Sequence, residues 1–586
     1  MRKLFALLSL LVIASMALAA CGGGTTPATE APVVPAEPQA TEAPAEPTAE
    51  PYHGTLRINM GSFPDIVDPQ KSSFVGEIAV LKLVYEGLTR LDKDLNTIPA
   101  AAESWEYNDD ATVLTFTLRE GLTYSDGSLL NAARFEYSFH RNSDPATAGE
   151  YASIADDILG AAEFRSCAEN CDAVRDAFYE NTKASHADGA ACTGYDDEAC
   201  NTFTVKLKQA GPYFHTVASL WVGYPAKQEL IEAGGENWWL DAANHIGNGP
   251  FVMTTLEQGT QVAFVPNETY WAGVATYDID YAYIVDGAVA FEAYKNDEFD
   301  IVGLGAEDLG TVQNDPTLSA EANIYPGSCT FAMMFHQQKA PFTDVKVREA
   351  FAMAIDRDAW VSDVLKGLGS STLTWIPKGF PGYQDGETRL AFDAAAAVQS
   401  LTDGGYTVVD GQLIGADGKA IEIVDTFSDT PRNRTRNEWL VAKWKEVLGI
   451  DVKLNPVEST TYTALTKDIN TAPQMFILGW CADYPDPQNW LSVYWKTGAF
   501  GERIGYSNPE LDALMTQADA ELDSAKRADL YAQAQDMLVA GSPVAFMWNN
   551  VNSYLVKPWV KGATQTPMDS GWIGDNDPLS ITLEAH

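Results

Sequence analysis

Hydrophobic and polar positions follow two different periods along the chain, and together they predict a mixture of strands and helices. Leu114, Phe116 and Leu118 share one face of the segment Thr112–Leu118, which is typical of a half-buried strand. In Asp344–Ile355 the apolar residues instead recur at helical spacing, with a carboxylate at the start, where it is favourable. Strands that alternate with helices in this way predict mixed α/β domains.

The same patterns and their turn residues place the other elements. Further strands are expected over Thr55–Met60, Thr202–Leu207, Phe251–Thr255, Gln261–Pro266, Ile450–Leu454 and Met475–Leu478. Further helices are expected over Glu77–Glu86, Asn131–Arg141, Asp393–Gly404 and Arg434–Leu448, and from Asn508 onwards. Residues 161–200 are polar and carry four cysteines, so they are expected to form an irregular surface insertion.

The stretch Gly479–Pro487 concentrates candidate chemistry at the end of one expected strand. Trp480, Asp483 and Tyr484 follow a short apolar run, and two prolines then prevent further strand pairing. A carboxylate between aromatic rings at a strand end suits a small cationic or amine-bearing ligand. The alternative is a buried, paired aspartate beside core aromatics, and these residues alone do not decide between the two.

The first twenty residues indicate export. Arg2 and Lys3 precede the apolar run Leu4–Leu18, which is too short for a transmembrane span and is typical of a signal peptide. The run ends in Leu-Ala-Ala-Cys, which resembles a bacterial lipobox, so residues 1–20 would be removed and Cys21 would carry lipid. An ordinary secretory signal is the alternative. A lipid anchor would hold the protein at the outer face of the cytoplasmic membrane.

Composition and net charge limit the classes of partner that the protein is expected to bind. Residues 21–52 are rich in Pro, Ala, Glu and Thr and are expected to form a disordered stalk behind the lipid. The net charge of −43 argues against binding nucleic acid, which requires clustered cations. The length of 586 residues corresponds to roughly three or four domains.

Cysteines support the export hypothesis. With Cys21 lipidated, an even number remains, which suggests disulfides in an exported protein. These six are Cys167, Cys171, Cys192, Cys200, Cys329 and Cys481. Cys167 with Cys171 and Cys192 with Cys200 are close enough to form local loops. Zinc binding is the alternative, but His186 is the lone histidine near them, so no metal or other cofactor is expected.

Catalytic signatures are missing. The chain has no His-Glu-x-x-His motif, no phosphate-binding Gly-x-x-x-x-Gly-Lys-Ser/Thr loop and no Gly-x-Ser-x-Gly elbow. A binding protein is therefore expected rather than an enzyme, and an exported hydrolase is the rival from another class.

Eight short phrases occur in a set order along the chain, and these are Pro99–Trp105, Thr115–Gly121, Tyr124–Gly127, Asn248–Phe251, Asn267–Trp271, Pro341–Arg348, Ala354–Arg357 and Val556–Trp559. Together they resemble the family 5 extracellular solute-binding proteins of ABC importers. The likeness runs from residue 55 to the C-terminus apart from the cysteine-bearing insertion, and is strongest to the oligopeptide-binding class. It implies a monomeric protein that captures an extracellular solute, most simply a peptide, and delivers it to a membrane permease. Oligosaccharide capture is the alternative.

The resemblance also implies the fold, which is an α/β, type II periplasmic-binding-protein-like architecture with two lobes around a cleft and an additional inserted domain. Domain I would comprise residues 53–85, 222–328 and 551–586. Domain II would comprise 86–221, including the insertion 161–200, and domain III would comprise 329–550.

Site residues follow from the same resemblance. Asp483 matches an aspartate that pairs with the α-amino group of a peptide, with Trp480 and Tyr484 as walls and Tyr151 lining the pocket. The ligand would lie extended and bond to the backbone of Gly479–Cys481 and of Ser73–Val75, which is β-strand addition. A Cys329–Cys481 disulfide beside the site is implied as well.

The chain departs from the peptide-binding pattern at the carboxylate end of the ligand. Ile477 and Asp468 occupy places where such proteins carry arginines, and neither residue replaces bidentate arginine recognition. Lys366 and Lys467 are candidate substitutes. Ser73 stands where a second carboxylate would join Asp483 at the amine, so the length and identity of the ligand stay open.

Overall fold

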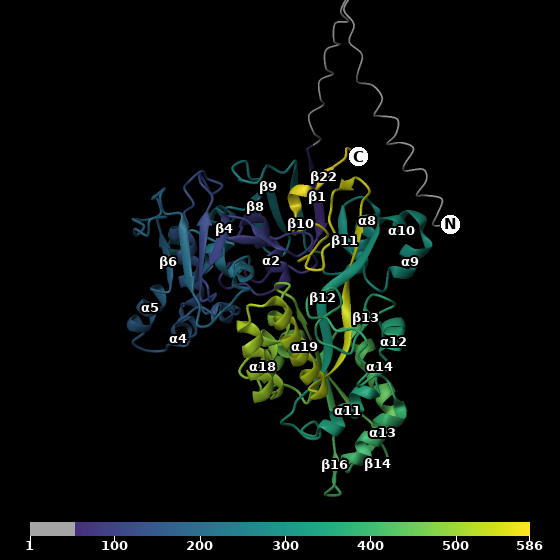
Figure 1. Ribbon diagram of the computed structural model, residues 1–586. Coiled ribbons are helices and arrows are strands. Elements are labelled where there is room, and N and C mark those ends of the chain that lie inside the picture. The colour runs from purple at the N-terminus through teal and green to yellow at the C-terminus, as the bar shows by residue number, and fades with distance from the viewer. Residues whose placement is uncertain (1–52) are drawn as a thin grey trace, which may run out of the picture. The chain divides into compact units, whose positions relative to one another are not determined.

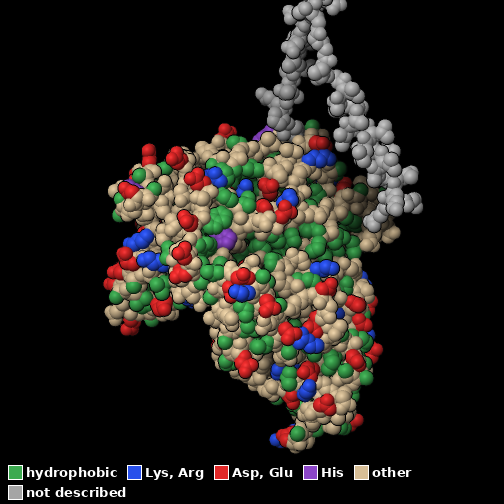
Figure 2. Space-filling model, in the orientation of Figure 1, with side chains coloured by type: hydrophobic (Ala, Val, Ile, Leu, Met, Phe, Trp, Pro, Cys, Tyr) green, Lys and Arg blue, Asp and Glu red, His purple; other side chains and the backbone are tan. Residues whose placement is uncertain are grey.

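The computed structural model describes residues 53–586. The expectations for the signal peptide, Cys21 and the stalk therefore lie outside the described residues. Among the residues described, no helix combines the length and the apolar character needed to cross a membrane. On the face shown in Figure 2, acidic and basic side chains are interspersed, and no basic patch stands out.

One eleven-stranded mixed sheet is the largest sheet of the described chain (Figure 1). Its order is β18-β17-β19-β12-β20-β11-β1-β10-β9-β8, and β13 adds to β20. The bounds, in this order, are Lys453–Val457, Val424–Ser428, Met475–Cys481, Ala322–Phe335, Val544–Val556, Ile301–Gly303, Gly54–Asn59, Tyr277–Ala282, Gln261–Pro266, Phe251–Glu257 and, for β13, Ser370–Ser371. The long antiparallel pair β12 and β20 runs through the centre and belongs to both halves of the sheet.

Alternate side chains of β12 enter two different cores, so helices cover both faces of this half of the sheet. Met333 and Phe335 pack with one set of helices, whereas Ala332 and Met334 pack with another. The first set is α11 (Val345–Met353), α13 (Ala394–Asp403) and α14 (Pro431–Leu448). The second set is α18 (Pro509–Ala520) and α19 (Ser524–Ala540), and Figure 1 shows the two sets on opposite sides of β12.

A separate four-stranded sheet lies within residues 86–221. Its order is β4-β5-β7-β6, with bounds Ala102–Tyr107, Val113–Leu118, Thr202–Lys206 and Thr182–Ser185. Helix α3 (Ala132–Ser143) packs on it through Phe139, whose ring stacks on Phe203 at 5.4 Å. This part of the chain therefore has a sheet of its own, whereas its buried residues share one core with Leu56 and Ile279 of the large sheet.

The insertion 161–200 is not irregular, which corrects the prediction from its polarity. It contains α4 (Ala161–Arg165), α5 (Asp172–Tyr179) and β6, which pairs with β7. Phe164 and Phe178 anchor these elements in the core, and Phe178 is fully buried. A few large apolar residues outweigh the polar composition of the segment.

Other expected elements are present with small shifts. Helix α14 begins at Pro431 because Thr430 caps it, three residues before the expected start. Strand β18 begins at Lys453 rather than Ile450, since Ile450 and Val452 pack into the core below α14 first.

The remaining elements are shorter. The helices are α2 (Val75–Val84), α6 (Phe214–Val217), α7 (Gln228–Gly234), α8 (Gly287–Lys295), α9 (Leu309–Asn314), α10 (Pro316–Glu321), α12 (Arg357–Ala359), α15 (Ser459–Lys467), α16 (Pro487–Trp490) and α17 (Ser492–Trp495). Small sheets are formed by β2 (Thr89–Leu91) with β3 (Thr97–Pro99), by β14 (Thr407–Val409), β15 (Gln412–Ile414) and β16 (Ala420–Ile421), and by β21 (Val560–Lys561) with β22 (Thr582–Leu583).

The expected boundaries between domains I and III fall inside continuous strands. Residues 328/329 lie within β12 and residues 550/551 lie within β20. The ladder between these strands is interrupted there, with register shifts between Pro326 and Thr330 and between Phe331 and Ala332. The two parts share one sheet, and the irregular stretch is where their strands bend.

Candidate functional site

A cavity of about 1500 Å³ opens where β19 ends, opposite the start of α2 and the segment around Tyr151. Most of the residues expected to bind ligand line it: Ser73, Val75, Tyr151, Gly479, Trp480, Cys481 and Asp483. The fold therefore gathers residues that lie more than 400 positions apart in the chain.

One edge of β19 is open at this cavity. On its other edge β19 pairs with β12 along its whole length, from Phe335 opposite Met475 to Cys329 opposite Cys481. Within residues 53–586, the neighbouring β17 pairs with β19 only at Met475. The backbone of Gly479–Cys481 therefore has no strand partner on the cavity side and can accept one.

Gly479 is required by packing. A Cβ at this position would lie 2.6 Å from Cδ1 of the Phe331 ring on the paired strand. Two residues on, Cys329 and Cys481 form a disulfide with their Cα atoms 3.9 Å apart. This bond fixes the register of β19 against β12 beside the cavity.

Asp483 is held by two donors on the same oxygen. The Tyr151 hydroxyl and the Asn489 amide, the latter at 3.0 Å, both donate to Oδ2. Within the described chain, Oδ1 accepts no hydrogen bond. Burial raises the pKa of Asp483 to about 6, although the two hydrogen bonds lower it. A partly buried carboxylate with a free oxygen at a cavity is equipped to accept a further donor.

Asn489 was not identified from the sequence. It is fully buried in α16, and its Oδ1 accepts hydrogen bonds from Trp480 Nε1 at 3.0 Å and from the Asp483 backbone N–H at 3.2 Å. Asp486 caps α16, and Arg527 forms an ion pair with it. The Asp-Pro pair that opens α16 was the available signal, since it turns the chain back toward Trp480.

Tyr151 approaches Asp483 from the other side of the cavity. Its ring stacks on Trp221 with centroids 5.2 Å apart, and Trp221 Nε1 donates to the Ser72 carbonyl at 2.7 Å. Since Tyr151 lies in residues 86–221 and Asp483 lies beyond β19, their hydrogen bond bridges two parts of the molecule.

The start of α2 presents a mixed surface to the cavity. Glu77 accepts hydrogen bonds from the backbone N–H groups of Ser73 and Phe74, at 2.8 and 3.0 Å, as in a capping box. Phe74 and Val75 are both about half exposed despite being apolar. Apolar side chains left open in a cavity wall suit contact with a ligand.

A carboxylate lies beside Ser73. The Ser73 hydroxyl donates to Glu150 Oε2 at 2.6 Å, and Lys467 lies 3.4 Å from Glu150 Oε1. Glu150 was missed because it contacts Ser73 only through the fold. Lys467 and Asp468 line the cavity, whereas Lys366 and Ile477 are not among its lining residues.

Tyr484 corrects the expectation of a second aromatic wall. Its side chain is fully buried, does not line the cavity, and donates a hydrogen bond to Gln488. Two residues that the sequence did not single out take this place. Phe500 and Tyr494 pack against Trp480 with ring centroids 4.9 and 5.3 Å away, and both line the cavity.

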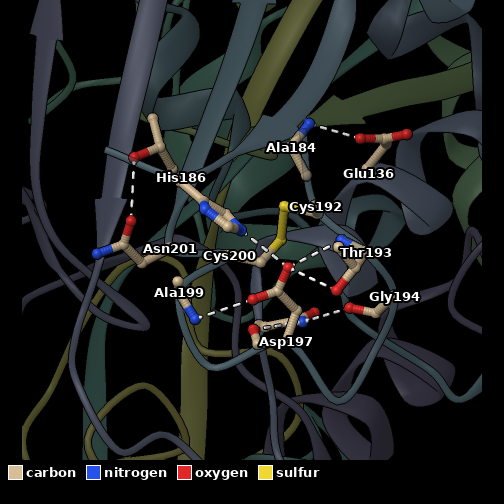
Figure 3. The surroundings of a disulfide bond; sticks show 12 residues. Glu136, Ala184, His186, Cys192, Thr193, Gly194, Asp197, Ala199, Cys200 and Asn201 are labelled. Atoms are coloured by element: carbon tan, nitrogen blue, oxygen red, sulfur yellow. Dashed lines mark hydrogen bonds and ion pairs between the residues drawn. A yellow bond between two sulfur atoms is a disulfide. The ribbon is translucent and has the colours of Figure 1, made fainter. Parts of the chain in front are cut away.

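The other four cysteines form the disulfides Cys167–Cys171 and Cys192–Cys200. Figure 3 shows the second, with His186 and Asp197 beside it. His186 Nε2 lies 2.8 Å from Asp197 Oδ2, which also accepts hydrogen bonds from Thr193, and these bonds lower the pKa of Asp197. Because the Cys192 sulfur is bonded to Cys200, the group closes a loop and offers no thiolate to a metal.

Comparison with known proteins is consistent with this geometry. The chain is 27% identical over 537 residues to the periplasmic oligopeptide-binding protein OppA of Salmonella typhimurium, covering 89% of this chain and 91% of that protein. It is 26% identical over 529 residues to the dipeptide-binding protein DppE of Bacillus subtilis, covering 89% and 92%.

Solved structures share the fold. The structure of Haemophilus influenzae OppA in complex with RPPGFSPFR has a TM-score of 0.73 at 23% identity, covering 91% of this chain and 99% of that one. This likeness confirms the expected multi-domain, type II-like architecture. The family model for the bacterial extracellular solute-binding proteins, family 5 Middle, matches residues 96–502. The chain therefore belongs to the family 5 bacterial extracellular solute-binding proteins.

Proposed function

We propose that this protein is the substrate-binding component of an ABC importer and that it captures peptides for a membrane permease. One observation carries the proposal: the unpaired edge of Gly479–Cys481 ends beside the Asp483 carboxylate in a large cavity. An extended peptide would add to this edge through its backbone, while its ammonium group would bind the free oxygen of Asp483.

The size of the cavity supports a ligand longer than a single amino acid. Pockets for small molecules measure roughly 300–1,000 Å³, whereas this one measures about 1500 Å³. Backbone hydrogen bonding also gives affinity that depends little on side chains, so peptides of different sequence would bind. The relatives named for oligopeptides and dipeptides support the same ligand class.

Closure would rest on the strands that join the two parts of the large sheet. The disrupted ladder between β12 and β20 is a natural place for a hinge, and the Tyr151–Asp483 hydrogen bond would form on closing. The ligand-binding roles of Trp480, Ser73 and Val75 belong to this proposal, as do the domain limits stated above.

The N-terminal residues would anchor the protein to the membrane. Lipid on Cys21, behind a cleaved signal peptide of residues 1–20, would tether the protein at the outer face of the cytoplasmic membrane with residues 21–52 as a spacer. The protein would act as a monomer, and it would bind and release its ligand without chemical change.

Mass spectrometry of the small molecules that co-purify with the protein tests the ligand class. Peptides are the expected result, followed by calorimetric titration with defined peptides. Oligosaccharides, which could stack on Trp480, Phe500 and Tyr494, would overturn the peptide assignment and leave the importer role. Turnover of peptides or glycosides by the purified protein would overturn the binding role itself.

A further inference from the structure

The cavity is lined by seven lysine and arginine side chains, and five of them are held by ion pairs or by hydrogen bonds to other side chains. The seven are Lys82, Arg90, Arg165, Lys208, Lys467, Lys496 and Arg503. Arg165, Lys208, Lys467 and Lys496 each form an ion pair with a carboxylate. Lys82 donates to Ser570 and Asn576. Arg90 forms no ion pair among the described residues and its Nε has no hydrogen-bond partner there, but its charge acts on the buried carboxyl of Glu86.

Arg503 differs from the four ion-paired side chains of the cavity wall. Within residues 53–586 it forms no ion pair, and its one hydrogen bond runs from Nε to the Phe500 carbonyl at 2.9 Å. The guanidinium carbon lies 5.3 Å from the centroid of the Phe500 ring, so a hydrogen bond and a cation–π contact hold the side chain. Both terminal nitrogens keep their donors for another group.

A buried hydroxyl without a partner lies in the same part of the wall. Tyr494 is 1% exposed and lines the cavity, and its hydroxyl has no hydrogen-bond partner among the described residues. Leaving such a group unsatisfied is unfavourable, so a ligand atom that accepts a hydrogen bond from it would relieve that cost. Burial raises the pKa of Tyr494, and the positive charge of Arg503 acts on the phenol in the opposite direction.

The two donors are tied to the amine-binding end of the cavity through one aromatic cluster. The Phe500 ring under Arg503 packs on Trp480, as does the Tyr494 ring. Trp480 in turn shares Asn489 with Asp483. The Arg503 guanidinium and the Tyr494 phenol, linked through Trp480 and Asn489 to the Asp483 carboxylate, form a charge arrangement complementary to a ligand with both an amine and an acid.

We infer that Arg503 and Tyr494 form a carboxylate-binding subsite of the cavity, which takes over the role of the arginines missing at Asp468 and Ile477. The inference rests on the proposed function, because it assigns the acidic group of a peptide ligand. That group is either the C-terminal carboxylate or a glutamate or aspartate side chain, since both present the same two oxygens to a guanidinium.

Calorimetric titration with three alanine peptides tests the subsite: a free acid, its C-terminal amide, and an amide that carries one glutamate. The unaltered protein should bind a carboxylate-bearing peptide at least about 10-fold more tightly than the plain amide. Arg503→Gln should abolish this preference without weakening the plain amide, and Tyr494→Phe should reduce it. Arg503→Lys should restore only part of it, because lysine lacks the fork.

The free acid and the glutamate-bearing amide distinguish the two sources of the carboxylate. Arg434→Gln, which removes a guanidinium from an exposed ion pair with Asp429 outside the cavity lining, should leave every affinity unchanged. A preference that survives Arg503→Gln in both peptides would overturn the subsite and leave the peptide-binding function intact. No binding of any peptide to the unaltered protein would overturn both.

Discussion

Asp425 on β17 and Asp483 just after the neighbouring β19 show how a binding carboxylate differs from a merely buried one. Asp425 lies on β17 and is fully buried, and neither of its oxygens has a hydrogen-bond partner among the described residues. Asp483 follows β19, receives two hydrogen bonds on Oδ2 and leaves Oδ1 free at the cavity. Burial raises the pKa of Asp425 to about 8 and that of Asp483 to about 6.

The two aspartates differ in their hydrogen-bond donors and in whether a ligand can reach them. At neutral pH, Asp425 is mostly a neutral acid that no ligand can reach, whereas Asp483 is mostly a carboxylate because Tyr151 and Asn489 stabilise its charge. A raised pKa by itself therefore marks burial rather than function. Preorganised donors together with an open lone pair at a cavity mark the binding group.

The largest expected effect is the loss of amine binding when the charge at position 483 is removed. Asp483→Asn should weaken the binding of peptides with a free α-amino group by at least about 100-fold, because a buried charge pair is replaced by an unpaired ammonium. Titration calorimetry measures it. N-acetylated peptides should bind the variant and the unaltered protein alike, and an unchanged affinity for the free amine would show that Asp483 is not the anchor.

A stability change is expected at Asp425. Its folded-state pKa of about 8 lies above the value near 4 of an unfolded aspartate, so the folded state binds the extra proton between these values. As the pH rises from 4 to 8, ionisation of Asp425 therefore lowers the free energy of unfolding by up to about 1.4 kcal/mol per pH unit. Asp425→Val should be at least about 2 kcal/mol more stable at pH 8 and gain much less at pH 4.

Urea unfolding at the two pH values measures this gain. Asp425→Asn serves as the matched variant, because it removes the ionisation and keeps an unsatisfied polar group. It should lose the pH dependence while gaining less stability than Asp425→Val. Equal gains at pH 4 and 8 would show that Asp425 does not titrate in this range.

The pH dependence of binding is the next effect in size. An ammonium binds the ionised form of Asp483, and this form disappears as the pH falls through about 6. The affinity for a free-amine peptide should be highest near pH 7, fall about 2-fold by pH 8 as the α-amino group loses its proton, and fall by up to about 10-fold per unit below 6. Titrations of N-acetylated peptides provide the baseline, and a flat profile down to pH 4.5 would contradict an ionised anchor.

Removal of the Tyr151 hydroxyl, one of the two hydrogen-bond donors to Asp483, should have the smallest effect on peptide affinity. Tyr151→Phe deletes a hydrogen bond that lowers the pKa of Asp483, so the midpoint of the pH profile should move upward. At pH 8 the affinity should change by less than about 5-fold, because Asn489 still holds the carboxylate. A midpoint that stays in place would mean that Tyr151 does not stabilise the charge.

Local chemistry along the sequence predicted the elements whose ends carry their own signals. Asn508 caps α18 and Asp393 caps α13, and both helices begin as expected. The long strands β12 and β20 escaped prediction because they are buried on both faces over half their length and show no simple alternation. Their pairing joins residues more than 200 positions apart, which no local pattern reveals.

The site divides in the same way. Asp483 could be singled out from its aromatic neighbours and the prolines after it, but its two donors come from α16 and from residue 151. Glu150 and Arg503 reach the cavity, and Asn489 reaches Asp483, only through the fold. Tyr484 was misplaced because residues next to each other at a strand end need not face the same way.

The open edge of β19 has one more consequence. An unpaired strand edge on a protein surface is a template for self-association, and exposed edges are usually blocked. Here the edge lies in a cavity whose lining includes Tyr151, Phe74 and Phe500. A short extended segment can pair with it there through backbone hydrogen bonds. The same unpaired edge that would promote aggregation on an open surface therefore serves to select extended chains.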